Sequence, residues 1–154
     1  MKKYLMIFVA ALLCAVSCGT GEPQYAKRTD KILAEIHNPN SKYVVVAVHR
    51  GDWRNYPENS IPAIESIIRM GADIMELDLK LTKDSVLVLS HDATVNRCLT
   101  GKGLVSDYTL AELKAMRLKR AHGVATDSLR IPTLREALEC CKDRICVNVD
   151  QGYE

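Results

Sequence analysis

The stretch Asp73-Ile-Met-Glu-Leu-Asp-Leu-Lys-Leu81 decides the fold, because apolar and polar side chains alternate along it from Met75 onward. A period of two is typical of a β-strand, whose successive side chains point to opposite faces. Glu76 and Asp78 therefore share one face, with Cα atoms about 6.6 Å apart, and both carboxylates could reach one cation. By itself, the pattern favours the simpler interpretation of an amphipathic strand with a solvated polar face.

Three other stretches predict strands around this one. The apolar, mostly β-branched run over residues 43–48 is typical of a strand that is buried on both faces of a parallel sheet. Residues 86–89 and 145–150 predict two further short strands.

Capping signals predict helices between these strands. Ser60 or Asn59 can cap a helix that ends at Gly71. Capping boxes at Thr109–Glu112 and Thr133–Glu136 open two more helices. Strands that alternate with helices form parallel βαβ units. The sequence therefore predicts an α/β fold with about four parallel βα units.

Polar side chains follow or lie within each predicted strand near its carboxyl end. Because these ends meet at one edge of a parallel sheet, the polar side chains are expected to lie together. The set comprises His49, Arg50 and Glu58 from the first unit, Glu76 and Asp78 from the second, His91 and Asp92 from the third, and Asp150 from the fourth.

The residue types in this set suit one kind of chemistry. Clustered carboxylates favour a hard divalent cation such as Ca²⁺ or Mg²⁺. Two histidines can share proton transfer, and the fork of Arg50 matches a phosphate group. A cation that polarises a phosphoryl oxygen, with an acid and a base beside it, hydrolyses phosphodiesters.

Each of these residues also has a purely structural interpretation. A histidine at a strand end is often a hydrogen-bonded core residue. Arg50 could simply pair with Glu58 and order the loop between them. Lys80, on the carboxylate face, could be a counter-ion inside the fold or a substrate ligand. Trp53 could line the site or only cover the end of the sheet.

The chain also resembles the glycerophosphodiester phosphodiesterase family from about Val44 to Asp150. The resemblance rests on ordered motifs, namely His49-Arg50-Gly51, Pro57-Glu58-Asn59, Glu76-Leu77-Asp78 with Thr82-Lys83-Asp84, His91-Asp92, and Ile131-Pro132-Thr133-Leu134 with Glu136. It implies a TIM barrel that hydrolyses a small-molecule glycerophosphodiester, such as glycerophosphocholine, to glycerol 3-phosphate and an alcohol.

The resemblance also implies a role for each matching residue. The two catalytic histidines correspond to His49 and His91, the residues that bind phosphate and organise the site to Arg50 and Glu58, and the metal ligands to Glu76, Asp78 and Asp150. The third metal ligand of the family is usually Glu, so Asp150 is one methylene shorter. The lysine common just beyond it is replaced here by Gln151-Gly152.

The length of the chain sets a second expectation. A closed (β/α)₈ barrel typically needs about 250 residues, and the chain has 154. The sequence therefore predicts the N-terminal half of a (β/α)₈ TIM barrel, a fragment of a longer enzyme. The alternative function is a catalytically inactive half-barrel or binding module that keeps the active-site edge.

The N-terminal residues indicate export. Residues 1–17 combine Lys2 and Lys3 with an apolar run too short to span a bilayer, as a signal peptide does. The approach to Cys18 resembles the lipobox of bacterial lipoproteins. This resemblance implies that Cys18 is lipidated and anchors the protein on the periplasmic side of a bacterial membrane.

The remaining sequence divides at about residue 43. Residues 18–42 predict a tether and a short helix, and residues 43–154 the partial phosphodiesterase domain. Without residues 1–17, which carry two lysines and no acid, 19 basic side chains face 19 acidic ones. A balanced charge gives no reason to expect nucleic acid as a partner.

Overall fold

The computed structural model describes residues 24–150. The predicted signal peptide, Cys18, Gln151 and Gly152 lie outside these residues. Within residues 24–150, every helix is too short or too polar to cross a membrane.

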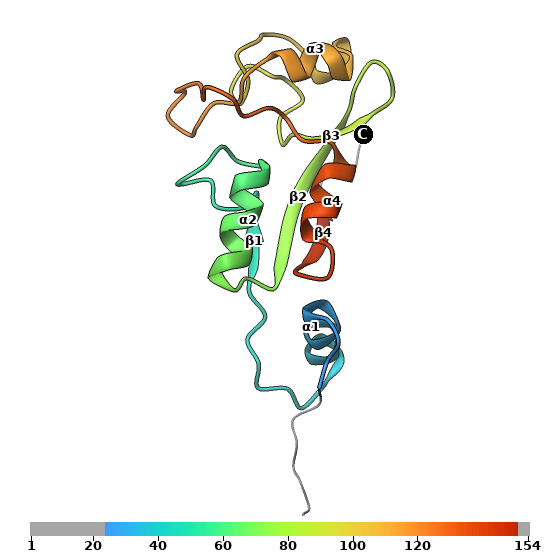
Figure 1. The fold of residues 1–154 in the computed structure, drawn as a ribbon. Coiled ribbons are helices and arrows are strands. Elements are labelled where there is room, and N and C mark those ends of the chain that lie inside the picture. Colours follow the sequence, from blue (N-terminus) through green and yellow to red (C-terminus); the bar gives the residue numbers. More distant parts are fainter. Residues whose placement is uncertain (1–23, 151–154) are drawn as a thin grey trace, which may run out of the picture.

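Three parallel strands form the centre of the fold (Figure 1). The long strand β2 (Ile74–Leu81) pairs with β1 (Ala47–His49) along one edge and with β4 (Cys146–Asp150) along the other. The helix α2 (Ile61–Met70) connects β1 to β2, and α4 (Leu134–Cys141) leads into β4. The predicted α/β fold with a parallel sheet is thereby confirmed for these three strands.

The strand β3 (Leu87–Leu89) runs antiparallel to β2, so the prediction of four parallel strands is wrong. Only residues 82–86 separate the two strands, whereas a parallel crossover needs a dozen or more residues. The Thr82 hydroxyl donates to Asp84 at 2.6 Å and accepts from the Val86 amide at 2.9 Å. Ser85 adopts a positive φ of 62°. The connection is a tight turn, and β2 and β3 form a hairpin.

The apolar face of β2 packs against α2 and α4, which lie on the same side of the sheet. Ser60 caps α2 by accepting a hydrogen bond from the Ala63 amide, and Gly71 ends the helix with φ of 88°. Thr133 opens α4 with the predicted capping box. The core between them contains Ile64, Ile67, Ala72, Met75, Leu77, Leu79, Leu89, Ala137, Cys141 and Ile145. Glu76 and Asp78 consequently project from the opposite face of β2.

The first strand is shorter and more exposed than predicted. β1 covers three residues instead of 43–48, and Val44 is 77% exposed. Ala47 and His49 are exposed and Val48 is half-buried, so the predicted burial on both faces is wrong.

Residues 93–131 form a lobe beyond the carboxyl ends of the parallel strands (Figure 1). The lobe contains the 3₁₀ turn η1 (Val105–Asp107) and the helix α3 (Leu110–Ala115), which begins at the predicted capping box of Thr109. Its core consists of Val95, Leu99, Val105, Leu113, Leu118 and Ile131, which pack together with Val88 of β3. α3 therefore belongs to an insertion after the hairpin and not to a third parallel βα unit.

The helix α1 (Arg28–His37) lies at the opposite end of the sheet. Arg28 donates to the carbonyl oxygens of Gly71, Ala72 and Arg144 and to Asp73 Oδ1 at 2.7 to 3.0 Å. From Arg28 onward, the segment predicted as a tether and short helix is therefore attached to the folded domain.

Candidate active site

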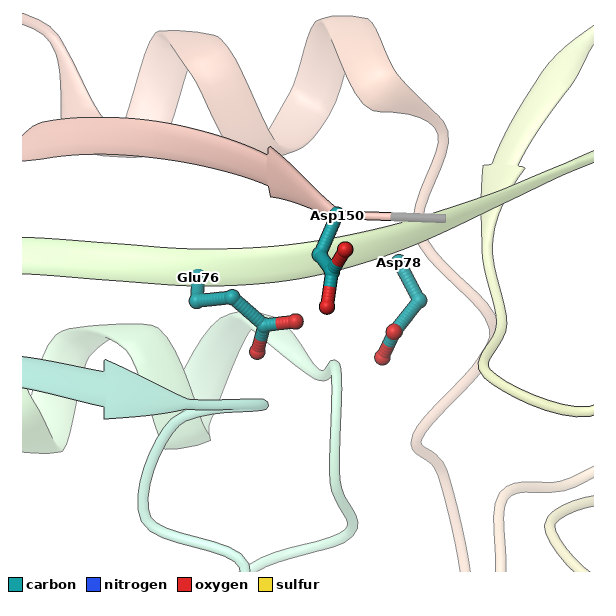
Figure 2. A group of neighbouring side chains, drawn as sticks. All are labelled: Glu76, Asp78 and Asp150. Carbon is teal, nitrogen blue, oxygen red and sulfur yellow. The ribbon is translucent and has the colours of Figure 1, made fainter. Parts of the chain in front are cut away.

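Three carboxylates converge at the carboxyl edge of the parallel strands (Figure 2). Glu76 and Asp78 come from β2 and Asp150 from the end of β4, and one oxygen of each lies within 4.8 Å of the others. We call these three residues the carboxylate cluster. Glu76 is 3% exposed and Asp78 1%, so the interpretation of a solvated strand face is wrong.

The register between β2 and β4 explains how Asp150 joins the cluster. The parallel pairing is continuous from Ile74 opposite Cys146 to Asp78 opposite Asp150. Residues opposite one another point to the same face, so the shorter side chain of Asp150 reaches the cluster without a bulge in β4.

The charge of the cluster favours a cation. Burial raises the pKa of Glu76, and the nearby negative charge of Asp78 raises it further. Three oxygen donors that repel one another fit a hard divalent cation, because the ion removes the repulsion. The residues present therefore suit the metal predicted for this position.

The loop after β1 brings His49 and Arg50 to the cluster. His49 Nδ1 lies 3.3 Å from Glu76 Oε2, and the Arg50 amide donates to the same oxygen at 3.2 Å. Gly51 follows with φ of 74°, and a Cβ there would lie 3.0 Å from the backbone and Cβ of Ala63. Glycine lets this loop approach α2 closely, which helps to hold the two preceding residues beside Glu76.

The Arg50 guanidinium lies between two carboxylates. Its Nη1 is 3.4 Å from Glu58 Oε1, and its Nε is 3.5 Å from Asp78 Oδ2. The predicted pairing of Arg50 with Glu58 is thus present. Asn59 Nδ2 donates to Asp78 Oδ2 at 2.9 Å, which gives that buried carboxylate a second, shorter contact.

His91 reaches the same edge by an unexpected route. Its strand is antiparallel, but the hairpin folds back along β2 so that the Ser90 amide donates to the Asp78 carbonyl at 3.0 Å. His91 and Asn59 line one small pocket. His91 Nδ1 lies 2.8 Å from Asp92 Oδ1. The hairpin therefore brings His91 to the side of the cluster that carries Asn59.

A cleft of about 410 Å³ opens beside this edge. It is lined by His49, Arg50, Trp53, Glu58, Arg97 and Ala121. Of the residues predicted from the sequence, His49, Arg50, Glu58 and Trp53 thus meet at one surface. A larger groove of about 840 Å³ runs along α4 and β3, but it contains none of the predicted site residues.

Arg97 is a cleft residue that no pattern in the sequence indicates. It belongs to the lobe and lies in a segment without strand or helix periodicity. The only local signal is the apolar pair Val95 and Leu99 at a spacing of four, which indicates a turn held by burial on both sides of Arg97.

Comparison with known proteins gives a family match over this region. The model of the glycerophosphoryl diester phosphodiesterase family matches residues 49–152. A glycerophosphodiester phosphodiesterase of Caldanaerobacter subterraneus is 44% identical over 107 residues, which cover 69% of this chain and 44% of the relative. Glycerophosphodiester phosphodiesterase 1 of Bos taurus is 32% identical over 147 residues, which cover 94% of this chain and 43% of the relative. The chain thus spans less than half of the length of these relatives.

Solved structures of the same family are also similar to this chain. A crystal structure of a glycerophosphoryl diester phosphodiesterase from Parabacteroides distasonis matches with a TM-score of 0.73 at 37% identity, over 80% of this chain and 44% of the other. An Oleispira antarctica phosphodiesterase, solved in complex with the product sn-glycerol-3-phosphate, matches with a TM-score of 0.65 at 28% identity, over 72% and 45% of the two chains.

Proposed function

The chain belongs to the glycerophosphoryl diester phosphodiesterase family, and we propose on that ground that it hydrolyses glycerophosphodiesters to glycerol 3-phosphate and an alcohol. The observation that carries the proposal is the convergence of Glu76, Asp78 and Asp150 beside His49, inside the region that the family model matches. The Oleispira antarctica relative, solved with sn-glycerol-3-phosphate, supports this class of product.

The carboxylate cluster is proposed to hold a divalent cation, Ca²⁺ or Mg²⁺. When bound, the cation would offset negative charge on the phosphoryl oxygens. Arg50 borders the cleft at the same place, and its guanidinium can donate to a phosphate group from there. Its contacts to Glu58 and Asp78 are long, at 3.4 and 3.5 Å, and its side chain is 31% exposed. The guanidinium can therefore donate hydrogen bonds to a phosphate in the cleft.

The two histidines are proposed to move the protons. Hydrolysis adds water across a P–O bond, so the attacking oxygen loses a proton and the leaving alcohol oxygen gains one. His49 is 75% exposed in its side chain and lines the cleft, while His91 lies on the Asn59 side of the cluster. One ring is proposed to act as base and the other as acid.

The experiment measures glycerophosphocholine hydrolysis by the full chain, with and without EDTA. Activity that EDTA removes and Ca²⁺ or Mg²⁺ restores is expected. His49→Ala and His91→Ala should each lower kcat by at least about 100-fold, and His122→Ala, an exposed histidine of the lobe, serves as the matched control. Full activity in both single variants would remove the assignment. Binding of glycerol 3-phosphate without hydrolysis would favour the alternative, an inactive binding module.

The described sheet is further proposed to be part of a (β/α)₈ barrel. The match to the Parabacteroides distasonis structure, which aligns 80% of this chain with 44% of that one, supports this architecture.

Export and lipid anchoring through Cys18 remain a proposal that rests on the sequence. Cells fed a labelled fatty acid should label the wild-type protein in the membrane fraction, on the periplasmic side. Cys18→Ser should abolish the label, and Cys98→Ser serves as the control. Label that survives in Cys18→Ser would contradict lipidation at this residue.

A further inference from the structure

Arg97 joins two carboxylates that come from distant parts of the chain. Its Nε donates to Asp92 Oδ2 at 2.8 Å and its Nη2 to Asp92 Oδ1 at 2.9 Å. The same Nη2 donates to Glu58 Oε1 at 2.9 Å, and Nη1 donates to Glu58 Oε2. All three guanidinium nitrogens are therefore engaged, and both carboxylates are bound in a two-pronged geometry.

The backbone around Arg97 is held in place by contacts other than these bonds. Val95 and Leu99 are each 1% exposed in the core of the lobe. The Leu99 amide donates to the Val95 carbonyl at 2.9 Å, and Asn96 Oδ1 accepts from the Gly103 amide at 2.9 Å. Since the turn is anchored on both sides, little backbone entropy is lost when the guanidinium binds.

This geometry differs from that of an ordinary surface ion pair. Isolated exposed pairs contribute only about 0–1 kcal/mol, because two mobile side chains must be ordered in water. Here the side chain of Arg97 is 46% exposed, but those of Glu58 and Asp92 are only 13% and 29% exposed, and one guanidinium binds both carboxylates. Glu58 also contacts Arg50, which contacts Asp78. The ion pairs thus form a continuous series from the carboxylate cluster to His91.

Asp92, which ends this series of ion pairs beside His91, determines which nitrogen of the His91 ring carries the hydrogen. Arg97 donates to both oxygens of Asp92 and so fixes the orientation of its carboxylate. These hydrogen bonds also hold the pKa of Asp92 well below its usual range, and an ionised carboxylate only accepts hydrogen bonds. His91 Nδ1, 2.8 Å from Asp92 Oδ1, must then carry a hydrogen. In the neutral ring, the basic lone pair consequently resides on Nε2.

We propose that Arg97 is a positioning residue, which holds Asp92 so that His91 keeps its hydrogen on Nδ1 and transfers protons through Nε2. The inference rests on the proposed function, because it assigns the atom through which His91 acts in that reaction. Arg97 itself need not touch the substrate. Its effect passes through Asp92 to the imidazole ring.

The first test does not require activity. In the full chain labelled with ¹⁵N-histidine, at a pH where the ring is neutral, the wild-type His91 signal should show the hydrogen on Nδ1. Arg97→Ala should shift most of the His91 population to the Nε2–H tautomer, which free histidine favours. Arg117→Ala, an exposed arginine of the same lobe, is the matched control, and the His91→Gln variant identifies the signal.

Arg97→Lys separates charge from geometry. Lysine keeps the positive charge but lacks the fork that binds both oxygens of Asp92, so its tautomer ratio should resemble that of Arg97→Ala. An unchanged ratio in a folded Arg97→Ala variant would overturn the proposal. A wild-type ratio in Arg97→Lys would overturn the part that depends on the fork. Dispersed amide spectra of each variant establish that it is folded.

The second test measures kinetics. Arg97→Ala should lower kcat by about 10- to 100-fold with little change in KM, as disturbing a supporting hydrogen-bond partner does, and added guanidinium should restore part of kcat. A fall in kcat/KM that comes from a higher KM alone, with kcat unchanged, would contradict the proposal. If the wild-type chain is inactive, the proposed function fails, while the tautomer measurement still decides the role of Arg97.

Discussion

At the scale of single residues, Asn59 supports the carboxylate cluster. The side chain is 2% exposed, donates to Asp78 Oδ2, and sits on a backbone with φ of 53°. Asparagine tolerates this left-handed conformation better than most residues. Its Oδ1 is buried without a hydrogen-bond partner among the described residues. Asn59 thus combines a demanding backbone position with a contact to a proposed metal ligand.

Substitution of Asn59 should separate these two contributions. Asn59→Gly removes the amide but accepts the positive φ, and we expect it to lower the free energy of unfolding by about 1–3 kcal/mol through the lost hydrogen bond to a buried charge. Asn59→Ala should cost about 1–2 kcal/mol more, because alanine is strained at this φ. Urea unfolding of both variants measures the difference. Equal stability of Asn59→Gly and the wild type would show that the amide contributes nothing.

At the scale of elements, an ion pair joins α2 to the turn before β4. Arg144 Nη1 and Nη2 each lie 2.7 Å from one oxygen of Glu65, in a parallel two-pronged geometry. The hydrogen bonds from Arg144 lower the pKa of Glu65 from 4.5 to about 2. A depressed pKa in the folded state means that the pair stabilises the fold above pH 4.5 and that this contribution is lost as the pH falls toward 2.

Glu65→Gln should therefore remove part of the acid sensitivity of the fold. Urea midpoints measured between pH 6 and about 2.5 should fall less steeply for this variant than for the wild type. The effect will be moderate, because both side chains are at least one third exposed and water screens them. Glu139→Gln, on the exposed side of α4, is the control. Parallel curves for wild type and Glu65→Gln would contradict the assignment.

At the scale of the whole molecule, the proposed cation site depends on long-range pairing. Asp78 and Asp150 lie 72 positions apart in the chain and meet only when β2 and β4 pair in register. A cation that binds this arrangement and not the unfolded chain must stabilise the fold. Stabilisation of the fold by the ion would therefore test both the binding site and the pairing of β2 with β4.

Thermal unfolding with Ca²⁺ or Mg²⁺ tests this linkage without an assay of activity. At a concentration about 100 times Kd, a bound ion should add about 2.7 kcal/mol to the free energy of unfolding. Asp150→Asn should abolish most of the increase, whereas Asp127→Asn, an exposed acid of the lobe, should not. An equal shift of Tm by the ion in wild type and Asp150→Asn would place the binding elsewhere.

The sequence could predict those features that depend on neighbouring residues. The caps at Ser60, Thr109 and Thr133 and the stop at Gly71 are local, and the structure confirms all four. The alternation along β2 likewise sufficed to place Glu76 and Asp78 on one face, because side-chain direction in a strand repeats every two residues. The order of the motifs was enough to indicate the family.

Features that depend on how distant segments pair were decided by the tertiary structure alone. The direction of β3 is an exception, because the connection from β2 has only five residues and is therefore too short for a parallel crossover. The expectation of regular βα units led to the wrong prediction there. No local pattern shows the burial of Glu76 and Asp78 or the bridge from Arg97 to Glu58. The sequence placed Asp78 and Asp150 at one edge of the sheet, but only the register between β2 and β4 sets them opposite each other. Such contacts arise from packing between elements, and a period of two or 3.6 residues carries no information about them.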